Sequence, residues 1–318
     1  MNIFDELRYL TGLGLIDLMR IIVNAPIRYK TYQIPKKSGG MRTIAQPSRE
    51  VKFLQRSVAN LILDSCAIHP AATAYKPGSR IFANADVHSQ NRVILKMDFQ
   101  DFFPSIRPLD WRQFAKEKLS LTPNDISISE KILFWGAGTS GPVCLSIGAP
   151  TSPQLSNILM FEIDTQISNV CDDLGVVYTR YADDITISGQ SKEILQRAER
   201  SITTIVLNTK RPNLTFNQKK RGIYTRSQRR IISGLKITPD GSVSIGRERK
   251  RMISSLVHKY SLNLLEDEIQ YKLKGLLAFA ADNEPQFVGR LRGKYGDQII
   301  DRIMKMHVPK RDLRRGQR

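Results

Sequence analysis

The chain has 318 residues, 41% of them hydrophobic, so it can bury a large core in one multi-lobed unit or in two domains. Its 49 lysines and arginines against 30 aspartates and glutamates give a formal charge of +19, which favours a polyanionic partner such as nucleic acid. No apolar stretch approaches the roughly 20 residues of a membrane span, and the three cysteines lack metal-binding spacing. We therefore expect a cytoplasmic protein without a membrane partner.

The first clear pattern is a β-hairpin near the N-terminus. Residues 29–44 alternate as strands do, and Lys36 to Gly40 form its expected turn. Basic side chains on such a hairpin suit the capture of a triphosphate, although ordinary surface cations remain the alternative. A helix is expected next, because apolar residues from Val51 to Ile62 recur at helical spacing.

A carboxylate follows the next apolar run. Val93 to Leu95 lead into Asp98, which we expect at the end of a buried strand. An unpaired charge there is costly unless a cation or hydrogen-bond donors meet it. Asp101 and Asp173 are weaker candidates, because a helix cap or a loop explains each more simply.

Two further helices are expected in the middle of the chain. The first is expected to be capped by Asp110. The second would begin with Ser152 as its N-cap and Pro153 in its first turn, and would bury one stripe: Leu155, Leu159, Ile163, Ile167 and Val170. Gln154 and Asn157 would then face elsewhere.

The most informative segment is Tyr181-Ala182-Asp183-Asp184. It lies at the tip of a predicted hairpin, between the β-branched and aromatic runs 175–180 and 185–189. By itself the acidic pair is a common solvated turn. Together with Asp98, however, three carboxylates from two strands would hold two Mg²⁺ ions, or Mn²⁺, about 3.5–4 Å apart. That arrangement predicts polymerase chemistry.

The C-terminal third is basic and becomes helical. Between residues 208 and 230 there are eight cations and no acidic residue: Lys210, Arg211, Lys219, Lys220, Arg221, Arg226, Arg229 and Arg230. Beyond the turn at 239–241, two helical stripes are expected, one from Ile253 to Tyr260 and one from Ile269 to Leu277. The tail from His307 is basic again, and a solvated surface is its simplest explanation.

The acidic motifs carry a resemblance to a known family. Residues 98–103, residues 148–153 with Asn157, and residues 181–184 resemble the successive palm motifs of reverse transcriptases, in the right order. Among these the chain most closely resembles the bacterial retron reverse transcriptases. Residues 84–88 fit their Asn-Ala-x-x-His signature, and residues 232–234 stand in place of their Val-Thr-Gly signature.

The resemblance runs from about residue 29 to residue 247 and departs from the family at two places. Ile147 stands where most members carry Gln, and Ile232-Ser233 replace Val-Thr. The resemblance implies an α+β right-hand polymerase fold, with fingers and palm in residues 1–240 and a helical thumb with a basic tail in residues 241–318.

The implied function is that of a Mg²⁺-dependent RNA-directed DNA polymerase, a nucleotidyltransferase. It would use deoxynucleoside triphosphates to copy part of a cognate structured non-coding RNA into branched multicopy single-stranded DNA, starting from a guanosine 2′-hydroxyl. The enzyme would stay bound to the branched RNA–DNA product. It would also restrain a co-encoded effector in anti-phage defence, in a higher-order assembly with that effector.

The resemblance also implies roles for single residues. Asp98, Asp183 and Asp184 would bind metal, and Lys220 would act on the pyrophosphate, with Lys219 as the alternative register. The expected nucleotide contacts are Arg42, Lys36, Phe103, Gln154 and Asn157, with Phe103 excluding the ribose 2′-hydroxyl. The expected RNA contacts are Asn84, His88, Ile232, Ser233, Gly234, Arg249, Lys250 and Arg251; for Asn84 and His88, satisfying buried backbone groups is the alternative.

Two other functions remain open from sequence. One is a different reverse transcriptase of the same fold, intron-encoded or of the abortive-infection type, which a tightly bound 2′-branched product would exclude. The other is a catalytically silent RNA-binding protein, for which the charge of +19 would suffice. The three intact aspartates argue against the silent protein.

Overall fold

The computed structural model describes residues 2–36, 39–136 and 141–309, and the chain forms two compact units. The first unit comprises residues 1–79 and 92–223, and the second comprises residues 80–91 and 224–318. The chain therefore leaves the first unit at residue 80, returns at residue 92 and leaves it again at residue 224. The domain boundary expected at residue 240 stays a prediction, and the basic tail from residue 310 lies outside the described residues.

The first unit holds a four-stranded sheet, a two-stranded hairpin and most of the helices. Its helices are α1 (Ile3–Thr11), α2 (Leu15–Asn24), α3 (Arg49–Leu61), α5 (Phe102–Ser105), α6 (Pro108–Lys118), α7 (Pro123–Leu133), α8 (Ser152–Leu159), α9 (Phe161–Asp173) and α10 (Lys192–Asn208), with 3-10 turns η1 (Ala25–Ile27), η2 (Leu63–Ser65) and η3 (Gln218–Lys220). Its strands are β1 (Tyr29–Pro35), β2 (Met41–Pro47), β3 (Val93–Asp98), β4 (Val177–Tyr181), β5 (Asp184–Gly189) and the first residues of β6 (Gly222–Thr225).

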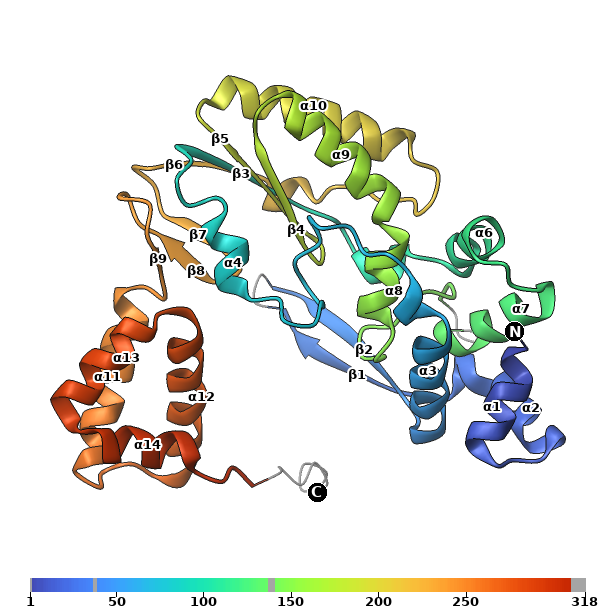
Figure 1. The fold of residues 1–318 in the computed structure, drawn as a ribbon, viewed down its shortest axis with the longest axis horizontal. Helices are drawn as coiled ribbons and strands as arrows, with labels where there is room; N and C mark the ends of the chain where they lie inside the picture. The colour runs from blue at the N-terminus through green and yellow to red at the C-terminus, as the bar shows by residue number, and fades with distance from the viewer. Residues whose placement is uncertain (1, 37–38, 137–140, 310–318) are drawn as a thin grey trace. The chain divides into compact units, whose positions relative to one another are not determined.

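The four-stranded sheet has the strand order β4-β5-β3-β6, so β5 and β3 lie at its centre. The centre of the sheet is well shielded from solvent, because β3 and β5 are buried along almost their whole length. Helices α9 and α10 lie together along one face of this sheet (Figure 1). Helices α9 and α10 thereby cover that face of the sheet.

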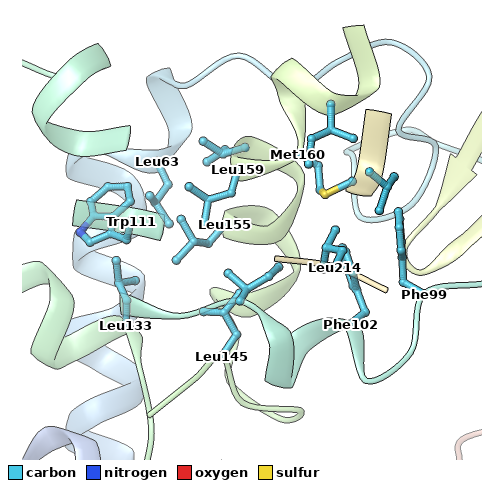
Figure 2. Packing of buried hydrophobic residues seen from close by; sticks show 14 of the residues in the cluster. Leu63, Phe99, Phe102, Trp111, Leu133, Leu145, Leu155, Leu159, Met160 and Leu214 are labelled. Atoms are coloured by element: carbon cyan, nitrogen blue, oxygen red, sulfur yellow. The ribbon is translucent and has the colours of Figure 1, made fainter. Parts of the chain in front are cut away.

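The hydrophobic core continues from the sheet into the helices beside it. Figure 2 shows Leu155 and Leu159 of α8 packed among leucines of neighbouring elements, with Trp111 of α6 at one side. The Trp111 indole nitrogen donates to the Ser129 hydroxyl at 3.0 Å, so its one polar atom is satisfied in the interior. Each fully buried leucine contributes about 1.5–3 kcal/mol to folding.

Two helix starts differ from the sequence prediction. Asp110 is the third helical residue of α6, and its carboxylate accepts from the Arg107 backbone nitrogen at 2.7 Å, so Arg107 is the N-cap. Ser152 is the first residue of α8, and Thr151 holds the N-cap position. The single helix expected from Ser152 to Val170 is broken at Met160 into α8 and α9, so Val170 is only half-buried.

The predicted hairpin at residues 29–44 is confirmed as β1 and β2, which pair from Tyr29 with Pro47 to Pro35 with Met41. Its expected turn includes residues 37 and 38, which lie outside the described residues. The Ile147 carbonyl accepts from the Ala45 backbone nitrogen at 3.0 Å and thereby fixes β2. Gly148 follows at φ +131°, where a Cβ would meet the Ala45 carbonyl oxygen at 2.9 Å, so this close approach requires glycine.

The second unit combines a small sheet with helices. Its elements are α4 (Ile81–Asp86), β7 (Arg230–Ile232), β8 (Leu235–Ile237), β9 (Val243–Ser244), α11 (Arg247–Ser261), α12 (Asp267–Asn283), α13 (Pro285–Tyr295) and α14 (Asp297–Lys305). The predicted stripes are largely confirmed, since Ile253, Val257, Leu273 and Leu277 are fully buried. Ile269 was predicted in the second stripe, but it is 38% exposed.

Among the described residues, no single helix is long and apolar enough to cross a membrane. Helix α1 and the segment Leu15–Ile27, which comprises α2 and η1, reach that length and hydropathy only when they are taken together, and they are bent by 110° with respect to each other.

Candidate active site

Sheet pairing brings the three predicted carboxylates together. Asp98 ends β3 and Asp184 begins β5, and the antiparallel register sets these two residues directly opposite each other. Side chains at such paired positions lie about 4.5–5.5 Å apart at Cβ. Next to them, the Asp183 carbonyl accepts from the Phe99 backbone nitrogen at 3.0 Å. Two like charges directly opposite destabilise a sheet, so the site needs a cation.

The turn that carries Asp183 has a left-handed backbone. Tyr181 pairs with Asp184, which leaves Ala182 and Asp183 as a two-residue hairpin turn, and Ala182 has φ +57°. This conformation is uncommon for a residue with a side chain. The Arg180 guanidinium donates to the Ala182 carbonyl at 3.0 Å, so the turn is held from inside the protein.

Arg180 belongs to a fully buried polar network. Its guanidinium donates to both carboxylate oxygens of Asp164, at 2.8 and 2.6 Å, and to the side-chain oxygen of Asn157 at 3.1 Å. The Tyr178 hydroxyl donates to the same Asp164 carboxylate at 2.7 Å. Both charged partners are fully buried, and their bonds tie the turn at Ala182 to α8 and α9.

The pKa values of Asp98 and Asp183 are both raised, so a cation beside them would relieve their negative charge. Burial and the neighbouring Asp183 and Asp184 raise the pKa of Asp98 to about 6, against the opposing effect of Lys220. Burial and then the charge of Asp184 raise the pKa of Asp183. These shifts reflect negative charge that is crowded into a poorly solvated place.

In this structure Lys220 supplies positive charge to Asp98. Its ammonium donates to both oxygens of Asp98, at 2.8 and 2.7 Å. Burial opposes this charge, but the bonds to Asp98 outweigh that effect and raise the pKa of Lys220. Within the described ranges, no three His, Cys, Asp or Glu side chains are arranged to hold a metal ion as they stand. The donor set of three crowded carboxylates nevertheless fits a divalent cation, which prefers oxygen ligands.

Of three further predicted nucleotide contacts, Arg42 is the one whose charge acts on this cluster. Arg42 of β2 lies near enough to lower the pKa of Asp183, after the larger effects already given. Lys36 lies 4.0 Å from the Asp101 carboxylate. Phe103 of α5 is half-buried, and its ring lies beside Phe102 and Tyr75.

The two predicted contacts on α8 are engaged with protein groups. The Gln154 side-chain nitrogen donates to the Asp64 carboxylate at 2.8 Å. Asn157 is fully buried, and besides accepting from Arg180 it donates to the Ala74 carbonyl at 2.9 Å. Asn157 therefore has the position of a supporting residue, and a direct nucleotide contact is not favoured by its burial.

In the second unit, the two signature segments meet. The Asn84 side-chain nitrogen donates to the Ser233 hydroxyl at 2.8 Å. Ser233 and Gly234 have φ +46° and +82° and join Ile232 of β7 to Leu235 of β8 as a two-residue turn. Asn84 and His88 are both buried, and Asn84 supports the turn from inside through its bond to Ser233.

The three predicted basic contacts of the second unit differ in position. Arg249 donates to the Gly234 carbonyl at 3.3 Å and lies over the Phe279 ring at 4.7 Å. Lys250 forms an ion pair with Glu284. Arg251 lines an open cavity of about 500 Å³ together with Arg229 and Arg247. Of the three, Arg251 is the one best placed for an anionic ligand.

The burial of His88 predicts a pH dependence of stability. Burial lowers the pKa of His88 to about 3, so protonation is favoured in the unfolded chain at any pH below 6.5. Stability is therefore lost as pH falls, and the loss from pH 7.5 to 5.5 should be about 1.4 kcal/mol for this one group. Thermal unfolding of wild type and of His88→Gln across this range measures the difference. Identical pH slopes in the two proteins would contradict the prediction, and exposed His307→Gln is the control.

Three features now stand together: an acidic cluster on a four-stranded sheet, a basic hairpin, and a net charge that attracts polyanions. Together they define the class of protein as a template-copying nucleotidyl polymerase. The family model for reverse transcriptase (RNA-dependent DNA polymerase) matches residues 34–260. This match covers the second strand of the hairpin, β2, and the three aspartates.

Comparison with known relatives assigns the chain to one subgroup of the reverse transcriptases. The chain is 36% identical to the retron Ec83 reverse transcriptase of Escherichia coli over 280 residues, which cover 87% of this chain and 90% of that protein. It is 34% identical to the retron Ec73 enzyme, over 87% of this chain and 90% of that protein, and 30% identical to the retron Ec86 enzyme, over 95% and 93%, both from Escherichia coli. The chain therefore belongs to the retron reverse transcriptases and is an RNA-directed DNA polymerase. The catalytically silent alternative is not supported.

Sequence reasoning missed the buried ion pair of Arg180 and Asp164. A signal was present, because Arg180 interrupts a strand of otherwise uncharged residues directly before the acidic turn. An arginine in a buried strand requires a carboxylate partner. The identity of that partner, 16 positions earlier, could not be read from the pattern.

Proposed function

We propose that this reverse transcriptase copies part of a cognate structured RNA into branched single-stranded DNA, begins at a guanosine 2′-hydroxyl of that RNA, and remains bound to the product. The observation that carries the proposal is the bond between Asn84 and Ser233, because it joins the two segments that distinguish the retron subgroup. The likeness to three retron enzymes over most of the chain supports it.

Enzymes of this family use divalent metal ions, and we propose Mg²⁺ here, with Mn²⁺ as a substitute. Asp98, Asp183 and Asp184 would hold two ions, which would activate the attacking hydroxyl and stabilise the leaving pyrophosphate. Lys220 then exchanges its bond to Asp98 for the pyrophosphate, where its ammonium neutralises charge or gives a proton. Arg42 and Lys36 bind the triphosphate, and Phe103 excludes a 2′-hydroxyl by its bulk.

Two open basic cavities support RNA binding. In the first unit, a cavity of about 550 Å³ at the base of the hairpin is lined by four cationic side chains, Arg28, Lys30, Arg49 and Lys52. In the second unit, Arg229 and Arg247 line the same cavity as Arg251, and Glu248 contributes a carboxylate to that lining. Cations grouped in this way bind phosphate backbones in a salt-dependent manner.

We place this function in the bacterial cytoplasm as part of an anti-phage system with a co-encoded effector protein. The support is the likeness to bacterial retron enzymes. A higher-order assembly with the effector completes the proposal.

The double substitution Asn84→Ala with His88→Ala tests the retron-specific part. It should lower 2′-primed synthesis on the native RNA by about tenfold or more, and lower extension of an annealed DNA primer much less, because the turn at Ser233 loses its support. Both reactions are measured with labelled deoxynucleotides. Asn60→Ala, an exposed asparagine of α3, is the matched control.

Equal losses in both reactions, together with a lowered melting temperature, would contradict a role in placing RNA. Asn84 and His88 would then only satisfy buried groups of the second unit, and the polymerase assignment would stand without them.

A further inference from the structure

Tyr75 holds an unusual backbone conformation beside the active site. It has φ +63°, in the left-handed region that residues with side chains rarely adopt. Strained residues of this kind persist only where the surrounding structure fixes them, and they gather at ligand sites. Here the observation is independent of any motif, because the sequence around Tyr75 carries none of the palm motifs.

The segment before Tyr75 is fixed by the elements that carry the site. The Arg180 backbone nitrogen donates to the Ala71 carbonyl, and its carbonyl accepts from the Thr73 nitrogen, both at 2.8 Å. The Ala74 carbonyl accepts from the buried Asn157 side chain at 2.9 Å. The network that holds the catalytic turn therefore also holds Tyr75.

The Tyr75 side chain borders the reacting groups. Its ring centroid lies 6.4 Å from that of Phe103, with the ring planes tilted by 33°. Burial raises the pKa of its hydroxyl, the charges of Asp183 and Tyr181 raise it further, and Arg42 opposes them. The side chain thus lies beside the aromatic ring that we assign to sugar selection and within electrostatic range of Asp183 and Arg42.

Core packing does not explain Tyr75, because the residue is 45% exposed. A large aromatic ring held in strained backbone and left open to solvent offers apolar surface to a ligand. The ligand that fits between a carboxylate cluster and a phosphate-binding arginine is a nucleoside triphosphate, and on the role proposed for Phe103 the part of it nearest these rings is the sugar.

We propose that Tyr75 forms a second wall of the sugar pocket beside Phe103, contacts the incoming deoxynucleotide and contributes to the exclusion of ribonucleotides. This inference rests on the proposed role of Phe103. The ring supplies the contact, so removal of the hydroxyl alone has little effect.

Single-nucleotide addition to a DNA primer annealed to an RNA template tests the proposal. For Tyr75→Ala, KM for the deoxynucleotide should rise about tenfold with a smaller change in kcat, and discrimination against the matching ribonucleotide should fall about tenfold. Tyr75→Phe should stay within about threefold of wild type in both quantities. Tyr9→Ala, which removes an 85% exposed tyrosine of α1, is the control.

Two further variants separate substrate contact from stability. Tyr75→Gly relieves the strained backbone, so it should melt no lower than Tyr75→Ala and yet show the same loss of discrimination. Combined with Phe103→Ala, Tyr75→Ala should change discrimination by less than the sum of the single effects, because the two rings share one pocket.

Unchanged discrimination in active Tyr75→Ala and Tyr75→Gly would overturn the inference, as would a parallel fall for both nucleotide types. If Phe103→Ala alters discrimination and the Tyr75 variants do not, the proposed role of Phe103 stands and the second wall is wrong. A wild-type enzyme that extends no primer would instead refute the polymerase function itself.

Discussion

Asp183→Asn should lower the rate of DNA synthesis by at least about a thousandfold and leave RNA binding within about twofold of wild type. The carboxylate lies in the turn beside Asp98 and Asp184, and in the proposed mechanism its charge acts on the transition state and not on the RNA backbone. Asp98→Asn should have the same effect. Primer extension and RNA retention are measured on the same preparations.

Asp173→Asn is the matched control, because this exposed aspartate at the end of α9 lies outside the cluster. It should extend primers at the wild-type rate. Substantial extension by Asp183→Asn or Asp98→Asn would show that the cluster is not the catalytic centre.

Arg180→Met should strongly destabilise the first unit. It leaves the fully buried Asp164 carboxylate without its cation, which costs about 3–5 kcal/mol. It also removes the donor to the Ala182 carbonyl, so DNA synthesis should fall beyond what the loss of folded protein explains. Chemical denaturation gives the free energy of unfolding, and primer extension gives the activity per folded molecule.

Arg112→Met is the control for Arg180→Met, because it removes the same charge from an exposed ion pair. Arg112 pairs with Glu130 through an exposed side chain, so its loss should cost about 0–1 kcal/mol. The double variant Arg180→Met with Asp164→Leu should recover much of the stability, because no unpaired charge remains, but activity should stay low. Full recovery of activity in that double variant would show that the network stabilises the fold without positioning the turn.

The parts of the site that follow from local pattern were predictable. Asp98 follows an apolar strand, and Asp183 and Asp184 stand between two β-rich runs, so their elements and their order could be derived. The hairpin from Tyr29 likewise follows from alternation and a glycine-rich turn. These signals lie within a few residues of the feature that they predict.

The parts that depend on distant contacts were not predictable. Asn157 was expected to face a nucleotide, but it is buried because it bridges Arg180 and the Ala74 carbonyl from different elements. The Asn84 side chain bonds to Ser233, which lies 149 positions later in the chain, and no periodicity in the sequence indicates such a contact. Helix starts were displaced by a residue or more, because a capping residue is chosen by local hydrogen bonds that several polar residues can supply.

The most direct test of the account is to purify the protein from cells and sequence the nucleic acid bound to it, with and without treatment by an enzyme that cleaves 2′–5′ linkages. We expect a structured RNA joined through one guanosine 2′-hydroxyl to a DNA strand complementary to part of that RNA, and release of the DNA only after cleavage of the linkage. The Asp183→Asn protein should retain the RNA without DNA. Bound RNA that carries no linked DNA in the wild-type protein, or DNA without a 2′–5′ junction, would contradict the account.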